Sequence, residues 1–123
     1  MIHLIAIALG GAVGALSRYG ISLGMQRLAG PAFPWGTLAA NVTGCLLLGM
    51  LAELVATSES LSPLQQRALS VGFLGALTTF STFALETVHL LEQQRTLAAL
   101  ANIGLNLAVG LAAVWVGIVL VRQ

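Results

Sequence analysis

The sequence predicts an all-α membrane protein, a single domain over residues 1–123 with four transmembrane helices, the third of them broken near its middle. Two observations predict this class. Hydrophobic residues make up 58% of the chain and charged residues only 7%, a balance that soluble domains do not have. Four windows of about 20 mostly apolar residues follow one another, each long enough to cross the hydrocarbon core of a bilayer, and their connections are too short to hold another domain.

The predicted helices cover, in order, approximately residues 4–25, 35–55, 68–91 and 97–121. Gly30 and Pro31 separate the first helix from the second, because proline lacks the amide proton that a helix interior needs. Before the third helix, Ser62 is a candidate N-cap, Pro63 suits the first helical position, and Gln65 can complete a capping box.

The third helix is expected to unwind from Gly75 to Thr78. Gly72 and Gly75 remove side chains just before two threonines, and β-branched residues whose hydroxyls compete for backbone hydrogen bonds weaken a helix further. Unwound backbone at membrane depth occurs only where it is buried in protein or lines a cavity. The carbonyl groups that it frees are suitable oxygen ligands for a hard cation.

Directly after this point the segment TTFSTF alternates hydroxyl groups with aromatic rings. Phe80 and Phe83 are three residues apart and share a helix face. Ring edges are electropositive, and the hydroxyls of Thr79, Ser81 and Thr82 can donate hydrogen bonds. Such groups can replace part of an anion's hydration shell without a fixed positive charge, which favours conduction over tight binding. Ordinary packing of the two rings is the alternative.

Other polar side chains lie at membrane depth, where each is a functional candidate. Asn41 in the second helix can donate to an anion or join two helices. Asn102 and Asn106 share one stripe of the last helix. Arg18 either forms a cationic vestibule or extends to the lipid headgroups. Glu86 has three possible roles: pairing with an arginine, bonding a neighbour, or relaying protons.

Small residues suit close contact between helices in a membrane. Gly10 and Gly14 are spaced by four residues in the first helix, as are Gly20 and Gly24. The last helix carries a comparable stripe of small residues. A four-helix domain fills its own centre with side chains, so a transport function favours assembly of more than one chain.

The charges argue for a particular kind of assembly. Arginines are almost equally divided between the two sides, with Arg67 and Arg122 on one side and Arg27 and Arg95 on the other. The positive-inside rule therefore gives no clear orientation. We expect the chain to insert both ways and to form an antiparallel, dual-topology homodimer, with a single topology fixed by one loop as the alternative.

Several functional classes are excluded by the residues present. The net charge of +1 offers no basic face for nucleic acid. No group of histidine, cysteine and carboxylate residues has metal-site spacing, and no nucleophile has a neighbouring base. We therefore do not expect an enzyme.

Three segments, GGAVGALSRY, GTLAANVTGCLLLG and GFLGALTTFSTFALE, resemble in order and spacing the characteristic sequences of the Fluc (CrcB) family of bacterial fluoride channels. The likeness covers nearly the whole chain. It implies a multi-pass protein of the bacterial inner membrane that exports fluoride passively from the cytoplasm and relieves fluoride toxicity. It also implies an antiparallel homodimer with two pores.

The resemblance implies roles for individual residues. Phe80 and Phe83 would offer ring edges to fluoride, Asn41 a donor, and Ser81 and Thr82 a polar track. A structural, non-transported sodium ion would lie on the dimer axis, held by backbone oxygens of Gly75 and Thr78. The predicted fluoride pathway comprises Asn41, Thr79, Phe80, Ser81, Thr82, Phe83 and Asn106, with Arg18 in the vestibule. Many members carry an aromatic or hydroxyl residue where this chain has Asn102 and Asn106.

Two other functions stay open on the sequence alone. A small proton-coupled antiporter would also use four helices in antiparallel pairs. It would need an embedded carboxylate in the first helix, which contains none, so Glu86 would have to serve instead. A structural membrane protein would pack the TTFSTF segment without any conduction path.

Overall fold

The computed structural model describes residues 1–123, and all its regular elements are helical. Four stretches are long and apolar enough to cross a membrane: α1 (Ile2–Ala29), α2 (Trp35–Thr57), Pro63–Glu92, and α6 (Thr96–Arg122). The predicted membrane class with four spanning helices is thereby confirmed.

The third stretch consists of four consecutive elements: α3 (Pro63–Arg67), the π-helical segment η1 (Ala68–Leu74), α4 (Gly75–Leu77) and α5 (Phe80–Glu92). Its start is the predicted capping box. The Gln65 amide donates to the Ser62 hydroxyl at 3.3 Å, and the Ser62 amide donates to the Gln65 side chain at 2.8 Å. Because these bonds satisfy donors that a helix start leaves free, the third stretch begins at Pro63, five residues before the expected position.

The break in the third stretch is real, but it is shorter and later than predicted. Gly75 keeps a helical conformation with φ −63° and ψ −33°. Only Thr78 and Thr79 are extended, with ψ values of 155° and 116°. The expectation that unwinding starts at Gly75 is therefore wrong, because a missing side chain weakens a helix without ending it. The chain leaves the helix where another element replaces its hydrogen-bond partners.

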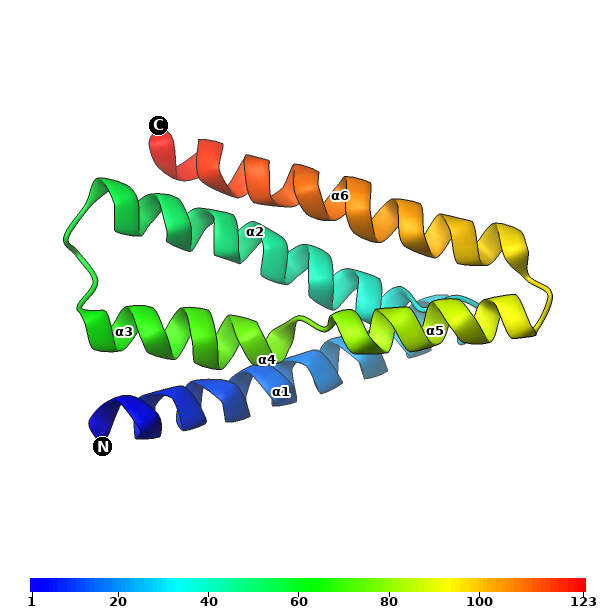
Figure 1. The fold of residues 1–123 in the computed structure, drawn as a ribbon, viewed down its shortest axis with the longest axis horizontal. Helices are drawn as coiled ribbons and strands as arrows, with labels where there is room; N and C mark the ends of the chain where they lie inside the picture. Colours follow the sequence, from blue (N-terminus) through cyan, green and yellow to red (C-terminus); the bar gives the residue numbers. More distant parts are fainter.

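The four spanning stretches run up and down, as short connections require. Figure 1 shows the N-terminus, the connection between α2 and α3, and the C-terminus at one end of the molecule. The connections from α1 to α2 and from α5 to α6 lie at the other end. This is the arrangement expected from four consecutive membrane crossings.

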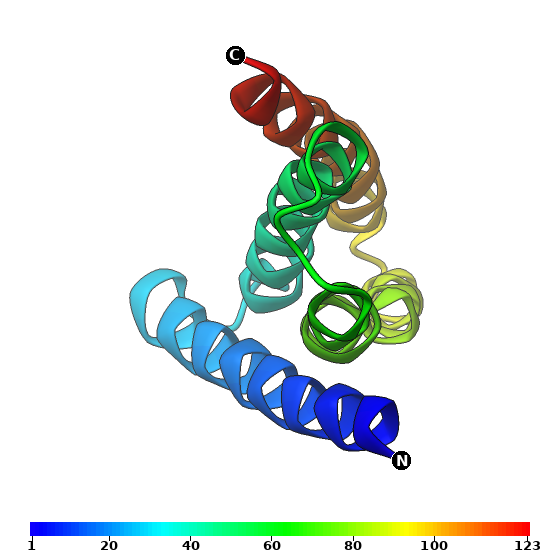
Figure 2. The same ribbon diagram turned by 90° about the vertical axis from the view of Figure 1, so that its left-hand side faces the viewer.

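The break lets the two halves of the third stretch pack on different helices. α1 contacts η1 and α4, whereas α5 contacts α6. Figure 2, a view from one end, places α1 and α6 at opposite extremes with α2 and the third stretch between them. One unbroken helix could not follow both neighbours, so the two extended residues redirect the chain between two packing surfaces.

Glycines allow the closest helix contacts. A Cβ atom added to Gly14 would meet the Phe73 carbonyl of η1, and one added to Gly117 of α6 would meet the Leu46 carbonyl of α2. The predicted close-contact role of Gly14 is therefore confirmed. Gly20, by contrast, has no atom within 4 Å of such a Cβ. The close contact that the sequence predicted for Gly20 is therefore not made within this chain.

One ion pair joins the ends of α2 and α6. Two of the Arg122 guanidinium nitrogens, Nε and Nη2, donate to the two Glu53 carboxylate oxygens at 2.9 Å. The Glu53 side chain is only 10% exposed, while that of Arg122 is 66% exposed. This two-point contact fixes the last turn of α6 beside α2, at the end of the molecule where the N-terminus also lies (Figure 1).

Candidate functional site

The site is built around the two extended residues of the third stretch. The Thr78 amide donates to the Leu74 carbonyl at 3.1 Å, and its hydroxyl donates to the same oxygen at 3.0 Å. The Thr79 amide leaves the helical pattern and donates to Oδ1 of Asn41 at 2.8 Å. In an α-helix that amide would bond the carbonyl four residues earlier, which here belongs to Gly75.

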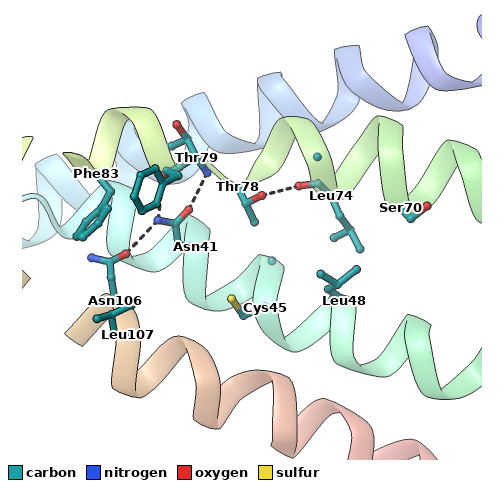
Figure 3. A pocket seen from close by; sticks show the side chains of 13 residues that line it. Asn41, Cys45, Leu48, Ser70, Leu74, Thr78, Thr79, Phe83, Asn106 and Leu107 are labelled. Atoms are coloured by element: carbon teal, nitrogen blue, oxygen red, sulfur yellow. Dashed lines mark hydrogen bonds between the residues drawn. The ribbon is translucent and has the colours of Figure 1, made fainter. Parts of the chain in front are cut away.

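Asn41 of α2 replaces the missing helical contacts. Its Nδ2 donates back to the Thr79 carbonyl at 3.2 Å, so a single carboxamide holds both polar backbone groups of Thr79. The same Nδ2 donates to Oδ1 of Asn106 on α6 at 3.0 Å. Figure 3 shows Asn41 between Thr79 and Asn106. An unsatisfied backbone group at membrane depth costs several kcal/mol, and Asn41 is the group that prevents this cost.

The start of α5 gathers hydroxyl groups. Thr79 is the N-cap, and its hydroxyl accepts from the Thr82 amide at 3.2 Å and lies 3.0 Å from the Thr82 hydroxyl. The Ser81 hydroxyl is 3.4 Å from that of Thr79. A helix N-terminus carries partial positive charge and free amides. Three hydroxyls and the positive end of α5 therefore meet in one place.

The two phenylalanine rings meet beside this cluster. Their centroids are 5.5 Å apart with planes tilted by 56°, a geometry that aromatic pairs prefer. Phe83 is buried, but Phe80 is 78% exposed. The pair therefore forms part of the surface of the chain and is not a dry core contact within it.

A groove of about 350 Å³ runs along the break. Its lining brings together many of the predicted site residues, namely Asn41, Gly75, Thr78, Thr79, Phe80, Phe83 and Asn106. Figure 3 shows the rings and amides at one end and Cys45, Leu48 and Leu74 at the other. Ser81, Thr82 and Arg18 do not line this groove. The first two lie on the exposed face of α5.

Arg18 lies at the break. Its Nη1 approaches the Thr78 carbonyl at 3.4 Å. A guanidinium at this position can compensate the partial negative charge of a carbonyl that ends a helical segment. It also brings a fixed positive charge close to the hydroxyl cluster at the start of α5.

Glu86 bonds a neighbouring hydroxyl, one of the three roles that the sequence leaves open. The Thr37 hydroxyl of α2 donates to its Oε1 at 2.7 Å. Its Oε2 is buried without a hydrogen-bond partner. Both residues line a second pocket near the connection between α1 and α2, apart from the groove at the break. Neither Arg18 nor Arg67 forms an ion pair with it.

Thr87 is a residue that the sequence reasoning missed. It is buried, and its hydroxyl donates to the Phe83 carbonyl at 2.8 Å and accepts from Nδ2 of Asn102 at 2.9 Å. A threonine hydroxyl in any helix can donate to the carbonyl of the residue four positions earlier. The spacing between Phe83 and Thr87 could therefore have indicated this bond from the sequence. Its partner Asn102 is fully buried and could not be identified from spacing.

Comparison with known proteins gives a consistent result. A family model described as CrcB-like protein, Camphor Resistance (CrcB), matches residues 5–118. A protein named "Fluoride-specific ion channel FluC" from Sorangium cellulosum is 48% identical over 95% of this chain and 92% of its own length. Proteins with the same name from Rhizobium meliloti and Geobacter sulfurreducens are 43% and 44% identical over at least 98% of both chains.

Proposed function

Because this chain belongs to the CrcB-like family, we propose that it is a fluoride-selective channel through which fluoride leaves the bacterial cytoplasm passively. Relatives across its whole length are named as ion channels and not as enzymes. The observation that carries the proposal is the break at Thr78 and Thr79, where hydroxyls, two aromatic rings, a helix N-terminus and a carboxamide meet beside a groove.

The chemistry of these groups suits a small, strongly hydrated anion. Hydroxyls and a carboxamide donate hydrogen bonds, and the edges of Phe80 and Phe83 add weak positive potential. Each group is a weak ligand by itself, so the ion is partly compensated for its lost water without being trapped. Arg18 supplies the one full positive charge near the break, where it can raise the local anion concentration without lying in the groove.

The surface of α5 supports a homodimer. Phe80 is 78% exposed, and the neighbouring Ser81 and Thr82 are also exposed in the single chain. Polar side chains facing lipid are unfavourable because hydrocarbon offers them no partner. A second copy would cover them and enclose the polar track between protein surfaces. The nearly even distribution of arginines favours an antiparallel arrangement, with one copy inserted in each orientation.

The direction of transport follows from the membrane potential. About 100 mV, negative inside, acts on each fluoride ion with about 2.3 kcal/mol directed outward. Fluoride crosses membranes inward as neutral HF and ionises in the less acidic cytoplasm. A channel in the inner membrane is therefore sufficient to export it, and no coupled energy source is needed.

A structural sodium ion fits the break. The Thr79 amide bonds Asn41, so the Gly75 carbonyl loses its α-helical donor, and the Thr78 carbonyl has a second lone pair besides the one facing Arg18. Backbone carbonyls are suitable ligands for a hard cation. Two antiparallel chains would provide four such oxygens and hold the ion on the dimer axis, where it would join the two broken helices.

The test is fluoride efflux from liposomes that contain the purified protein, followed with a fluoride electrode after a potassium ionophore is added, with chloride in a parallel run. We expect rapid fluoride release and no comparable chloride release. Phe80→Ile and Phe83→Ile should each lower fluoride flux about tenfold or more by removing the ring edges. Phe33→Ile is the matched control, because Phe33 packs on Trp35 outside the groove.

Two results would overturn the proposal. One is the release of neither anion by folded protein. The other is the antiporter pattern, in which Glu86→Gln abolishes transport while Phe80→Ile leaves it intact. Equal loss in Phe33→Ile and Phe80→Ile would contradict the ring-edge role alone.

A further inference from the structure

A continuous series of hydrogen bonds connects α5, α6 and α2. It starts at the Phe83 carbonyl, which accepts from the Thr87 hydroxyl at 2.8 Å. Thr87 accepts from Nδ2 of Asn102 at 2.9 Å, and Oδ1 of Asn102 accepts from Nδ2 of Asn106 at 3.0 Å. Oδ1 of Asn106 accepts from Nδ2 of Asn41 at 3.0 Å. The series ends where Oδ1 of Asn41 accepts the Thr79 amide at 2.8 Å.

The direction of this series is determined from its first member. A carbonyl can only accept, so the single hydroxyl proton of Thr87 is used on Phe83 and the Thr87 oxygen can only accept from Asn102. Asn102 must then turn its nitrogen toward Thr87 and its oxygen toward Asn106. The same reasoning orients Asn106, whose oxygen is left facing Asn41.

The last member requires the same direction independently. The Thr79 amide can only donate, so Oδ1 of Asn41 must face it and Nδ2 must face Asn106. A reversed carboxamide anywhere in the series would place two donors or two acceptors together. The orientation of a carboxamide is assigned from its hydrogen-bond partners. The Phe83 carbonyl at one end of the series and the Thr79 amide at the other assign the same orientations to the three asparagines. Nδ2 of Asn106 also bonds the Asn102 carbonyl at 3.0 Å, which holds that carboxamide at a second point.

We propose that Thr87 and Asn102 are positioning residues for anion conduction, which fix through Asn106 the orientation of the Asn41 carboxamide at the groove. This inference rests on the proposed fluoride channel. Neither residue can touch the ion, because Asn102 is 0% and Thr87 7% exposed and neither lines the groove. Both protons of Asn41 Nδ2 have protein acceptors, Thr79 and Asn106. An arriving anion must therefore compete for a proton whose direction Thr87 and Asn102 maintain.

Two substitutions of Thr87 separate this role from simple packing. Thr87→Val keeps the branched shape and removes the hydroxyl, whereas Thr87→Ser keeps the hydroxyl and removes a methyl group. If Thr87 positions Asn41, Thr87→Val should lower fluoride flux about five- to tenfold, which corresponds to the loss of about one net hydrogen bond. The flux of Thr87→Ser should stay within about twofold of the wild-type flux. If Thr87 only packs, Ser should be the more damaging change, and that order would overturn the proposal.

Thr57 provides the matched control. Its hydroxyl donates to the carbonyl four residues earlier at 2.8 Å, as that of Thr87 does, but at the end of α2 and outside the groove. Thr57→Val should leave fluoride flux unchanged. Absence of flux in the wild-type protein would refute the channel itself, whereas normal wild-type flux with equal Val and Ser values at position 87 would refute only the positioning role.

A spectroscopic measurement gives a second readout, which does not depend on flux. The chain contains only three asparagines, at positions 41, 102 and 106, so asparagine-selective ¹⁵N labelling yields three side-chain amide pairs. In wild-type protein the pair of Asn102 should exchange slowly with solvent. Thr87→Val should shift all three pairs and Thr87→Ser none by a comparable amount. Rapid exchange at Asn102 in the wild type, which can be measured even if Thr87→Val does not fold, would overturn the proposal.

Discussion

Replacing Asn41 with leucine tests whether a tertiary contact holds the break in the third stretch. Leucine has nearly the same shape, so the change removes hydrogen bonds without opening a cavity. Three bonds are lost: the one from the Thr79 amide at 2.8 Å, the one to Asn106 at 3.0 Å, and the one to the Thr79 carbonyl at 3.2 Å. The amide and the carbonyl of Thr79 would both lose the partner that Asn41 provides.

The expected loss can be calculated from these bonds. A net hydrogen bond contributes about 1 kcal/mol in soluble proteins and about 0.6 kcal/mol between membrane helices, so three bonds give about 2–3 kcal/mol. The free energy of unfolding can be measured by titration with SDS in mixed micelles, followed by the fluorescence of Trp35 and Trp115. Asn41→Asp keeps the acceptor for the Thr79 amide, but its second oxygen would face the Thr79 carbonyl and Oδ1 of Asn106, so it should not recover the loss.

The reasoning fails if Asn41→Leu unfolds within about 0.5 kcal/mol of the wild type, since that is less than one net hydrogen bond. The break would then be maintained by the packing of η1 on α1 and of α5 on α6, and Asn41 would be dispensable for the fold. Asn41→Asp should still conduct poorly even if it is stable, because it has lost both donors and a carboxylate repels an anion.

Two further predictions follow from the same structure. Gly117→Ala should lower the free energy of unfolding by about 1–3 kcal/mol, since the added methyl group would meet the Leu46 carbonyl of α2. Gly104→Ala places its methyl group in open space and should stabilise α6 by about 0.5–1 kcal/mol. Equal effects of the two substitutions in thermal melts would contradict the close approach of α2 and α6. Replacing sodium with a large organic cation throughout purification should lower the melting temperature and the dimer fraction, and melting unaffected by sodium would remove the proposed cation site.

The break illustrates how far local sequence reasoning extends. Glycines and β-branched threonines correctly indicated a weak point in the third helix, because these residue types have low helix propensity wherever they occur. They did not indicate the residues at which it unwinds. Gly75 stays helical, and the chain leaves the helix at Thr78 and Thr79, because Asn41, 38 residues earlier in the chain, offers Thr79 a replacement partner.

The polar side chains show the same division between what the sequence indicates and what the tertiary structure decides. The sequence placed Asn41, Asn102 and Asn106 at membrane depth, where an amide must find a hydrogen-bond partner, but it could not identify those partners. Similarly, Arg18 was expected in a vestibule or at the headgroups, and the structure places its guanidinium at the Thr78 carbonyl. Each of these contacts depends on how helices rotate about their axes.

By itself, the sequence determined the membrane class, the four spanning helices, the capping box at Ser62 and the segment of hydroxyls and rings that characterises the site. These properties depend on hydrophobic length and on interactions within a few residues, which the order of amino acids contains directly. The tertiary structure alone decided where the third stretch breaks, which helices its two halves contact and how the asparagines are linked. Those outcomes depend on contacts between residues far apart in the chain, such as the hydrogen bonds from Asn41 to Thr79 and Asn106, 38 and 65 positions away, and only the packed helices bring such residues together.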